Sequence, residues 1–453
     1  MPWLKKGTWT ILDQGLFAGS NFALNILLAR WMLPEEYGAF TVAFSVFMLL
    51  GTLHSGLLTE PMLVFGPGRY RRWLPQYLSA LLRGNAGFSV LSAVVLAAAG
   101  YGFYWYSAEE VATVLFALAL AQPFILFLWL ARRVCYVYHQ PKWAALSGLL
   151  YAALVLAGAV VLERTAWLSA VTALGLMSGA SLVAALVITL GYLRLPMLQP
   201  LPEKKTKAAS VQHWRYGRWI VGTGLLGWVV GYLPVLVLPA VAGLEAGGAL
   251  KALWNFTLPA LHVYTALSAL LLPTLVRVRG TDRFARIVRN LTALVTAIAL
   301  FYWVVLGVLG RPMIDWLYAG QYVEYADLLW LVGGLLMAGI GVVMSAALKA
   351  LERPQKVFRA FVFSALSVLT VGTACIYAFG LVGALLSLLI GMAVETALEL
   401  YFFTRRGQEG TGSAIRSKAG ARPRGSGRPK ASATKRPPPG LPAPGARRAD
   451  RSR

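Results

Sequence analysis

Three amide side chains lie on one face of the first apolar stretch of the chain. Gln14, Asn21 and Asn25 are separated by seven and four residues, and the small Ala18 lies between them on the same helical face. Polar side chains surrounded by lipid turn toward a helix bundle or a water-filled cavity. We therefore expect these amides to line a substrate cavity; the alternative is that they form hydrogen bonds between neighbouring helices.

A second polar face carries a positive charge. Lys251, Asn255 and His262 follow spacings of four and seven in a later apolar stretch. An ammonium group beside amide and imidazole donors could hold phosphate oxygens or sugar hydroxyls. The alternative is that Lys251 extends to the outer lipid headgroups and that His262 is a hydrogen-bonded core residue.

Arg30 is a further candidate for this cavity. It lies at the outer end of the first apolar stretch, at a depth that matches that of Lys251. An anion that crosses hydrocarbon needs cations along its route, because an unpaired charge there is very costly. The alternative is an ion pair with Glu35 or Glu36, or a contact with headgroups.

Carboxylates within the apolar stretches are candidates for ion coupling. Asp13 precedes the first amide, and Glu395 and Glu399 are one helical turn apart, so their mutual repulsion favours binding of a proton by one of them. Pairing with Arg405, Arg406 or loop arginines is the simpler alternative.

No motif for catalysis or for nucleotide binding occurs in the sequence. It contains no GxxxxGK[ST] loop, HExxH helix, nucleophile elbow or glycine-rich dinucleotide fingerprint. The two cysteines, Cys135 and Cys375, have no metal-ligand spacing around them. We expect no catalytic residue, metal or cofactor, and energy would come from an H+ or Na+ gradient, the membrane potential or consumption of product on the far side.

The composition requires a membrane as solvent for most of the chain. Apolar residues make up 58% of the 453 residues and charged residues 13%, with a mean hydropathy of +0.64; soluble proteins carry about 25% charged residues. Because lipid leaves backbone groups unsatisfied unless they form helices or closed barrels, stretches of about 20 apolar residues predict an all-α integral membrane protein. Twelve such stretches are expected, at about 9–32, 38–65, 84–106, 111–131, 143–162, 167–193, 218–242, 248–276, 290–310, 326–349, 358–379 and 381–403.

The basic residues predict the orientation of these spans. With the N-terminus inside, inner segments before the tail hold 26 Lys and Arg, and outer segments hold four. This asymmetry favours a multi-pass protein of the bacterial inner (cytoplasmic) membrane with both termini cytoplasmic. The net charge of +24 is thereby divided among short loops and the tail, so nucleic acid is not an expected partner.

The two halves of the chain resemble each other weakly. Gly-Thr-Trp at 7–9 and Gly-Arg-Trp at 217–219 open two spans 210 residues apart, and PMLV at 61–64 matches PTLV at 273–276 at an offset of 212. A duplication with six helices in each half gives two lobes in the same orientation, with a transport route between them.

The predicted domains follow from this repeat. A six-helix lobe at 1–193 is joined by a cytoplasmic linker, 194–217, to a second six-helix lobe at 218–403. Pro61 and Pro273 would bend equivalent helices and are candidate hinges, although proline is common in membrane helices.

The remaining residues, 404–453, form a predicted tail. Residues 407–453 contain 12 Lys and Arg against two acidic residues, with no aromatic residue and abundant proline and glycine. Such a segment cannot bury enough apolar surface to offset the entropy of ordering, so we expect a disordered basic cytoplasmic tail. Its charge suits the anionic inner leaflet; the alternative is an extension without a function.

Three patches resemble a known family. The segments LDQGLFAGSNFALNILLARWMLPEEYGAF at 12–40, EPMLVFGPGRYRRW at 60–73 and YAGQYVEYADLLWL at 318–331 are similar to those of the bacterial polysaccharide-transporter family. Its members are the O-antigen and exopolysaccharide lipid-linked oligosaccharide flippases of the multidrug/oligosaccharidyl-lipid/polysaccharide exporter superfamily. The resemblance implies a fold similar to that of MATE transporters and related flippases.

The resemblance also implies a function. It indicates a transporter, not an enzyme, that flips a polyprenyl-diphosphate-linked oligosaccharide across the cytoplasmic membrane by alternating access. Membrane lipids and other polysaccharide assembly proteins are further expected partners. The alternatives are an ion-coupled multidrug or metabolite exporter of the related branch, a membrane glycan polymerase or ligase, and a membrane scaffold without transport activity. The mid-helix polarity is amide and basic, which favours an anionic glycolipid over the organic cations of a drug exporter.

Overall fold

The computed structural model describes residues 2–193 and 200–419, which are helical apart from short connections. The chain divides into two compact units, Met1–Thr404 and Arg405–Arg453. Most of the predicted basic tail, from residue 420 onward, lies outside the described residues. The boundaries of the two predicted lobes stay a prediction.

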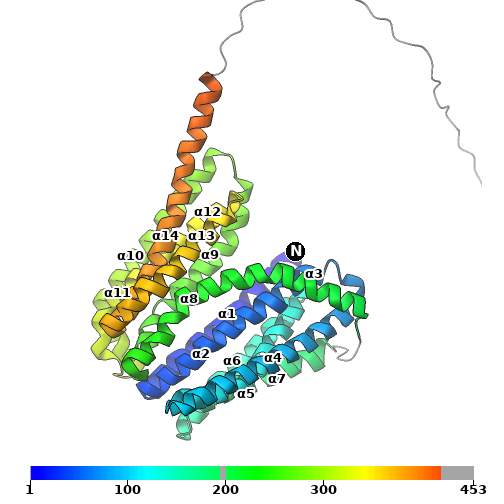
Figure 1. Cartoon of the computed structure of the whole chain (residues 1–453), viewed down its shortest axis with the longest axis vertical. Coiled ribbons are helices and arrows are strands. Elements are labelled where there is room, and N and C mark those ends of the chain that lie inside the picture. Colours follow the sequence, from blue (N-terminus) through cyan, green and yellow to red (C-terminus); the bar gives the residue numbers. More distant parts are fainter. Residues whose placement is uncertain (1, 194–199, 420–453) are drawn as a thin grey trace, which may run out of the picture. The chain divides into compact units, whose positions relative to one another are not determined.

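Figure 1 shows the order of the helices. The first half of the chain contains α1 (Pro2–Trp31), α2 (Pro34–His54), the π-helical segment η1 (Ser55–Thr59), α3 (Glu60–Phe65), the 3-10 turn η2 (Arg71–Trp73), α4 (Leu74–Trp105), α5 (Glu109–Val137), α6 (Pro141–Arg164), α7 (Ala170–Ile188) and the π-helical η3 (Thr189–Leu193). The second half contains α8 (Glu203–Asn255), α9 (Leu258–Arg277), α10 (Asp282–Tyr318), the 3-10 segment η4 (Val323–Leu328), α11 (Leu329–Leu335), α12 (Ala338–Ala350), α13 (Pro354–Ser367), the π-helical η5 (Val368–Gly372) and α14 (Thr373–Ala419).

Ten helical stretches of the described chain are long and apolar enough to cross a membrane. Two of them, Glu203–Asn255 with 53 residues and Pro354–Arg405 with 52, are long enough for two crossings of about 20 residues each. Each contains a kink at a glycine in the positive-φ region, Gly243 with φ 85° and Gly380 with φ 54°, where a side chain would be strained. The part of α8 after Gly243 leads into α9, and the two together correspond to the predicted span 248–276. Gly380 separates the predicted spans 358–379 and 381–403. Each of the twelve predicted spans can therefore be assigned to a helical segment.

Local sequence explains several helix starts. Pro34, Pro141 and Pro354 stand in the first turns of α2, α6 and α13, where the missing N–H of proline has no helical partner to lose. Glu35 and Glu36 follow Pro34 in the first turn of α2, and acidic side chains stabilise the positive end of the helix dipole.

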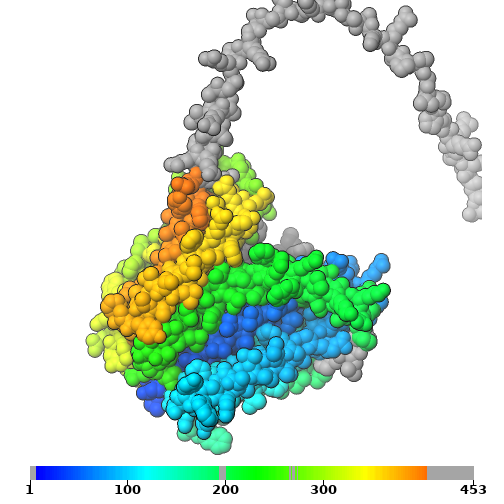
Figure 2. All heavy atoms as spheres, in the orientation of Figure 1, coloured from blue at the N-terminus to red at the C-terminus, as the bar shows by residue number. Residues whose placement is uncertain are grey.

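The two halves of the chain meet along α2 and α8, which lie side by side over much of their lengths (Figure 1). On the face shown in Figure 2, α8 (green) lies between the blue and cyan helices of the first half and the yellow and orange helices of the second. Glycines make this contact possible. A Cβ atom on Gly38 would overlap the carbonyl of Leu244, and one on Gly217 would overlap the carbonyl of Gly56. We call this contact the α2–α8 seam.

The bend at Pro61 is built into the seam. Pro61 has no N–H to donate to the carbonyl of Leu57 four residues earlier, and the helix widens into η1 just before it. His213 of α8 supplies a donor instead, because its Nδ1 lies 2.9 Å from the Leu57 carbonyl oxygen. Its Nε2 then accepts a hydrogen bond from the Tyr77 hydroxyl at 2.6 Å.

The second candidate hinge, Pro273, lies inside the continuous helix α9. Its side chain lies outside the described part of the structure. A hinge role for Pro61 or Pro273 stays a prediction.

Candidate functional site

A cavity of about 230 Å³ lies where α1, α2, α5, α8 and α9 come together. Four of the residues predicted for the substrate cavity are among those that line it, namely Asn21, Asn25, Lys251 and His262, together with Ala18. They come from both halves of the chain, which the sequence separates by more than 200 residues. The remaining described lining is apolar or aromatic, and it contains no carboxylate. We call this the central cavity.

Lys251 places an unneutralised positive charge at the wall of the central cavity. The residue is 6% exposed, and no carboxylate of the described chain lies within 4.0 Å of its ammonium group. Its Nζ lies 5.6 Å from the ring centre of Phe44 and 5.5 Å from that of Trp254. Aromatic faces partly stabilise a desolvated cation but leave its N–H donors available. This arrangement can bind an anion.

The amides of α1 leave a free acceptor at the cavity. Asn21 donates to the carbonyl of Phe17 at 2.8 Å and accepts from the Tyr151 hydroxyl at 3.1 Å. Asn25 donates to the carbonyl of Asn21 at 2.8 Å, while its Oδ1 is buried and has no hydrogen-bond partner among the described residues. A buried acceptor without a donor is costly, so a ligand hydroxyl at this position would stabilise the site.

Aromatic side chains form much of the remaining wall. Phe44 and Phe47 of α2, Trp129 of α5 and Tyr232 of α8 contribute rings to the lining. Rings of this kind present broad apolar faces that can pack against a sugar ring. The sequence alone does not single out these rings, because aromatic residues are frequent throughout the chain and their spacing does not distinguish the cavity wall from the core.

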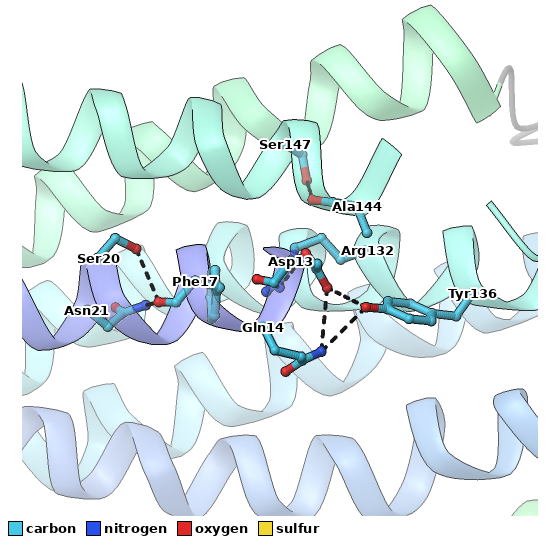
Figure 3. A network of polar contacts seen from close by, with 9 residues as sticks. All are labelled: Asp13, Gln14, Phe17, Ser20, Asn21, Arg132, Tyr136, Ala144 and Ser147. Atoms are coloured by element: carbon cyan, nitrogen blue, oxygen red, sulfur yellow. Dashed lines mark hydrogen bonds and ion pairs between the residues drawn. The ribbon is translucent and has the colours of Figure 1, made fainter. Parts of the chain in front are cut away.

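Gln14 is not part of the described lining of the central cavity and belongs to a polar network between α1 and α5 (Figure 3). Its amide nitrogen lies 3.4 Å from Asp13 Oδ2 and 3.5 Å from the Tyr136 hydroxyl. Asp13 is fully buried and accepts hydrogen bonds from Arg132 at 2.7 Å and 3.2 Å and from Tyr136 at 2.6 Å. The Arg132 guanidinium also stacks 3.8 Å from the ring centre of Phe17, which lines the cavity. The network therefore fixes α1 against α5 next to the cavity wall.

Arg30 lies at a contact between α1 and α10. Its Nη1 donates to the carbonyl oxygens of Trp316 at 2.6 Å and Leu317 at 3.1 Å. Gln321 returns a hydrogen bond of 3.1 Å to the carbonyl of Arg30. We call these interactions the Arg30 contact. The guanidinium satisfies carbonyls at the end of α10 that have no partner within the helix.

Asn255 is fully buried in a cluster of tyrosines. Its Nδ2 lies 3.1 Å from the Tyr37 hydroxyl and 3.5 Å from the Tyr318 hydroxyl. Tyr318 in turn donates to the carbonyl of Ala252 at 2.8 Å. Asn255 is therefore not part of the described lining of the central cavity, although Lys251, four residues earlier in the chain, is.

The paired glutamates lie in the second half of the chain. Glu399 of α14 is fully buried, and Ser345 of α12 is a weak hydrogen-bond donor near its carboxylate, which makes no close hydrogen bond with the described residues. Lys349 of α12 interacts electrostatically with both Glu395 and Glu399, although no ion pair forms. Neither glutamate belongs to the described lining of the central cavity.

Solved structures with the same fold are transporters. An inward-facing multidrug resistance MATE transporter of the MOP superfamily matches with a TM-score of 0.72 and 15% identity, over 86% of this chain and 94% of that one. An outward-facing structure of such a transporter gives a TM-score of 0.63 with 14% identity, over 89% of this chain and 94% of that chain. The lipid II flippase MurJ in an inward closed conformation gives 0.62 with 14% identity, over 87% of each chain. The protein is therefore a multi-pass helical membrane protein with the MOP transporter fold, which is not an enzyme fold.

The family follows from the sequence comparison. The model of the polysaccharide biosynthesis protein family matches residues 3–279, more than half of the chain. The chain belongs to this family. No curated protein sequence matches it. The predicted family, the all-α membrane fold and the absence of an enzymatic role are thereby confirmed at this level.

Proposed function

We propose that this protein flips a polyprenyl-diphosphate-linked oligosaccharide across the bacterial cytoplasmic membrane by alternating access, with both termini in the cytoplasm. One observation carries the proposal, namely the buried and unneutralised ammonium group of Lys251 at a cavity between the two halves of a transporter fold. A diphosphate is an anion that must be stripped of water during the crossing, and a fixed cation offsets part of that cost.

The central cavity would hold the polar head of the substrate. Lys251 would bind the diphosphate, Asn25 and His262 would bond to sugar or phosphate oxygens, and Phe44 and Trp129 would pack against the sugar. The polyprenyl chain would stay in lipid. The cavity is small, so it fits the diphosphate and the sugar next to it better than a long glycan.

The outer side would open and close through the Arg30 contact. The greater similarity to the inward-facing than to the outward-facing MATE structure supports an inward-facing state here. In that state α1 and α10 are held together by Arg30, and outward opening would require the release of its bonds to Trp316 and Leu317. We thus assign Arg30 to closure of the outer side and not to substrate binding.

Glu399 is the stronger of the ion-coupling candidates. Its carboxylate is buried without an ion pair or a close hydrogen bond in the described chain, so binding of a proton or a cation would relieve an unpaired charge. Asp13 already accepts hydrogen bonds from Gln14, Arg132 and Tyr136 and forms an ion pair with Arg132, which suits a fixed structural role.

The alternative is a drug or metabolite exporter of the related multidrug branch. The similarity to MATE transporters agrees with this alternative at the level of the fold. Organic cations, however, need an anionic cavity, whereas the described lining of the central cavity carries the cation of Lys251. Reconstitution in liposomes distinguishes the two. We expect a diphosphate-linked oligosaccharide to reach the opposite leaflet, whereas efflux of a cationic dye without glycolipid movement would support the exporter.

A further inference from the structure

A second cavity, of about 270 Å³, lies between α4 and the first turns of α8. Its walls include Leu58, Leu81 and Gly84 on one side and Ser210 and Trp214 on the other. The lining is mostly apolar, and both Gly84 and Trp214 are exposed, so the cavity is an open groove. It is separate from the central cavity, with which it shares no lining residue.

The structure fixes which face of α8 points outward at this groove. Ala209, His213 and Gly217 form a buried stripe at intervals of four residues, and His213 bonds to both Leu57 and Tyr77. The opposite faces of the helix are therefore exposed. Trp214 is 60% exposed on one of these faces.

Basic residues adjoin the lining residues of the groove in the sequence. Residues 203–218 contain five Lys and Arg against one acidic residue. Lys207 and Arg215 are exposed and adjoin the lining residues Thr206 and Trp214, and Arg83 is exposed beside Gly84. Lys207 forms an exposed ion pair of 2.8 Å with Glu203, which a lipid phosphate could replace. Lys205 stacks 3.8 Å from the ring centre of Trp73. Tryptophan beside exposed cations is typical of a helix at a lipid headgroup layer.

We propose that this groove binds an anionic glycerophospholipid of the inner leaflet. One acyl chain would lie against Leu58, Leu81 and Gly84, and the headgroup phosphate would be held by Arg83, Lys207 and Arg215 with the Ser210 hydroxyl nearby. Charge complementarity selects an anionic lipid over a zwitterionic one. The bound lipid would hold the first turns of α8 against α4. It would thereby stabilise the position of the segment that begins the second half of the chain.

The groove can be filled without disturbing the fold. A Cβ atom on Gly84 would meet only Leu58 Cδ2, at an ordinary 3.5 Å, so Gly84→Leu places a side chain in the space proposed for the acyl chain. Gly87→Leu is the matched control, because Gly87 lies on the same helix with nothing within 4 Å of its Cβ position and outside the described lining. Either change also improves helix propensity.

The experiment uses the full chain purified in detergent, with phosphatidylglycerol or phosphatidylcholine added. Bound lipid is counted by native mass spectrometry and the unfolding temperature is recorded. We expect phosphatidylglycerol to raise the unfolding temperature of the parent and of Gly87→Leu by about 2–4 °C, and Gly84→Leu to show neither the rise nor the retained lipid. Equal effects of the two lipids, or a full phosphatidylglycerol effect in Gly84→Leu, would overturn the proposal.

A charge variant tests the headgroup contacts. Replacing Arg83, Lys207 and Arg215 together by Gln should weaken phosphatidylglycerol binding about tenfold or more. The control replaces Arg283, Arg286 and Arg289 of α10, which are also exposed, by Gln. Equal weakening in both triple variants would show a general effect of charge and would contradict a specific site.

Discussion

Arg30, near the end of α1, donates a hydrogen bond of 2.6 Å to the backbone carbonyl of Trp316, near the end of α10. The two residues are 286 positions apart, and the bond joins the first half of the chain to the second. The guanidinium is shared with the next carbonyl, that of Leu317. Arg30 thus bonds to backbone carbonyls and not to an acidic side chain. Breaking these bonds leaves no unpaired carboxylate, and this suits a contact that forms and breaks in each transport cycle.

Arg30→Ala should open the outer side. Because alanine cannot donate to the carbonyls of α10, we expect a cysteine at Asn21 in the central cavity to become more reactive to a membrane-impermeant maleimide added from outside. The increase should be about fivefold or more, for the removal of the two charge-assisted hydrogen bonds of Arg30. The background is a chain without Cys135 and Cys375. Arg311→Ala, an exposed arginine of α10, is the control, and equal labelling in both variants would remove Arg30 from the outer closure.

Asp13→Asn should destabilise the protein strongly. It leaves the guanidinium of Arg132, whose side chain is 9% exposed, without its carboxylate, and breaking a buried pair in this way costs about 3–5 kcal/mol. A double variant, Asp13→Leu with Arg132→Met, removes both charges and should be milder. Thermal unfolding in detergent measures both. A double variant that is less stable than Asp13→Asn would contradict this account of the pair.

Gly38→Ala should disrupt the α2–α8 seam. The added methyl group would overlap the backbone carbonyl of Leu244, which cannot rotate away, and overpacking of this kind costs about 1–3 kcal/mol. Gly222→Ala on α8 is the control, because nothing lies within 4 Å of its Cβ position. We expect a lower unfolding temperature only for Gly38→Ala; similar values for the two variants would mean that the seam is loosely packed.

Glu399→Gln should separate transport from its energy source. Glutamine keeps the shape of the side chain but cannot bind a proton or balance a cation, so flipping in liposomes should no longer respond to an imposed H+ or Na+ gradient. The fold should be retained, because the variant removes a buried charge that forms no ion pair in the described chain. Glu352→Gln, an exposed glutamate outside the spans, is the control. An unchanged response in Glu399→Gln would exclude this residue from coupling.

The spans and part of the central cavity could be predicted from the sequence, since both follow from local rules. Apolar stretches of about 20 residues locate the helices. Helical spacing put Asn21 and Asn25 on one polar face, and Lys251 and His262 on another. These four residues do line a common cavity in the structure.

Pairings between distant segments could not be predicted. Asp13 and Arg132 are 119 residues apart, and their ion pair depends on how α1 packs against α5. Arg30 bonds to backbone carbonyls, which carry no signal in the sequence. Asn255 follows the spacing of a cavity residue, but tyrosines from α2 and α10 enclose it. Residues 203–217, expected in a linker, are helical and continuous with the next span.

The proposal that Lys251 holds a diphosphate is tested most directly by flipping of a lipid-linked oligosaccharide in liposomes. At equal reconstituted amounts, we predict that Lys251→Ala slows appearance of the substrate in the opposite leaflet by about tenfold or more, for the removal of a charge-assisted hydrogen bond, and that Lys251→Arg retains much of the rate. Lys142→Ala, which removes an exposed cation outside the described lining, should leave the rate unchanged. A Lys251→Ala rate equal to that of the parent would contradict the account.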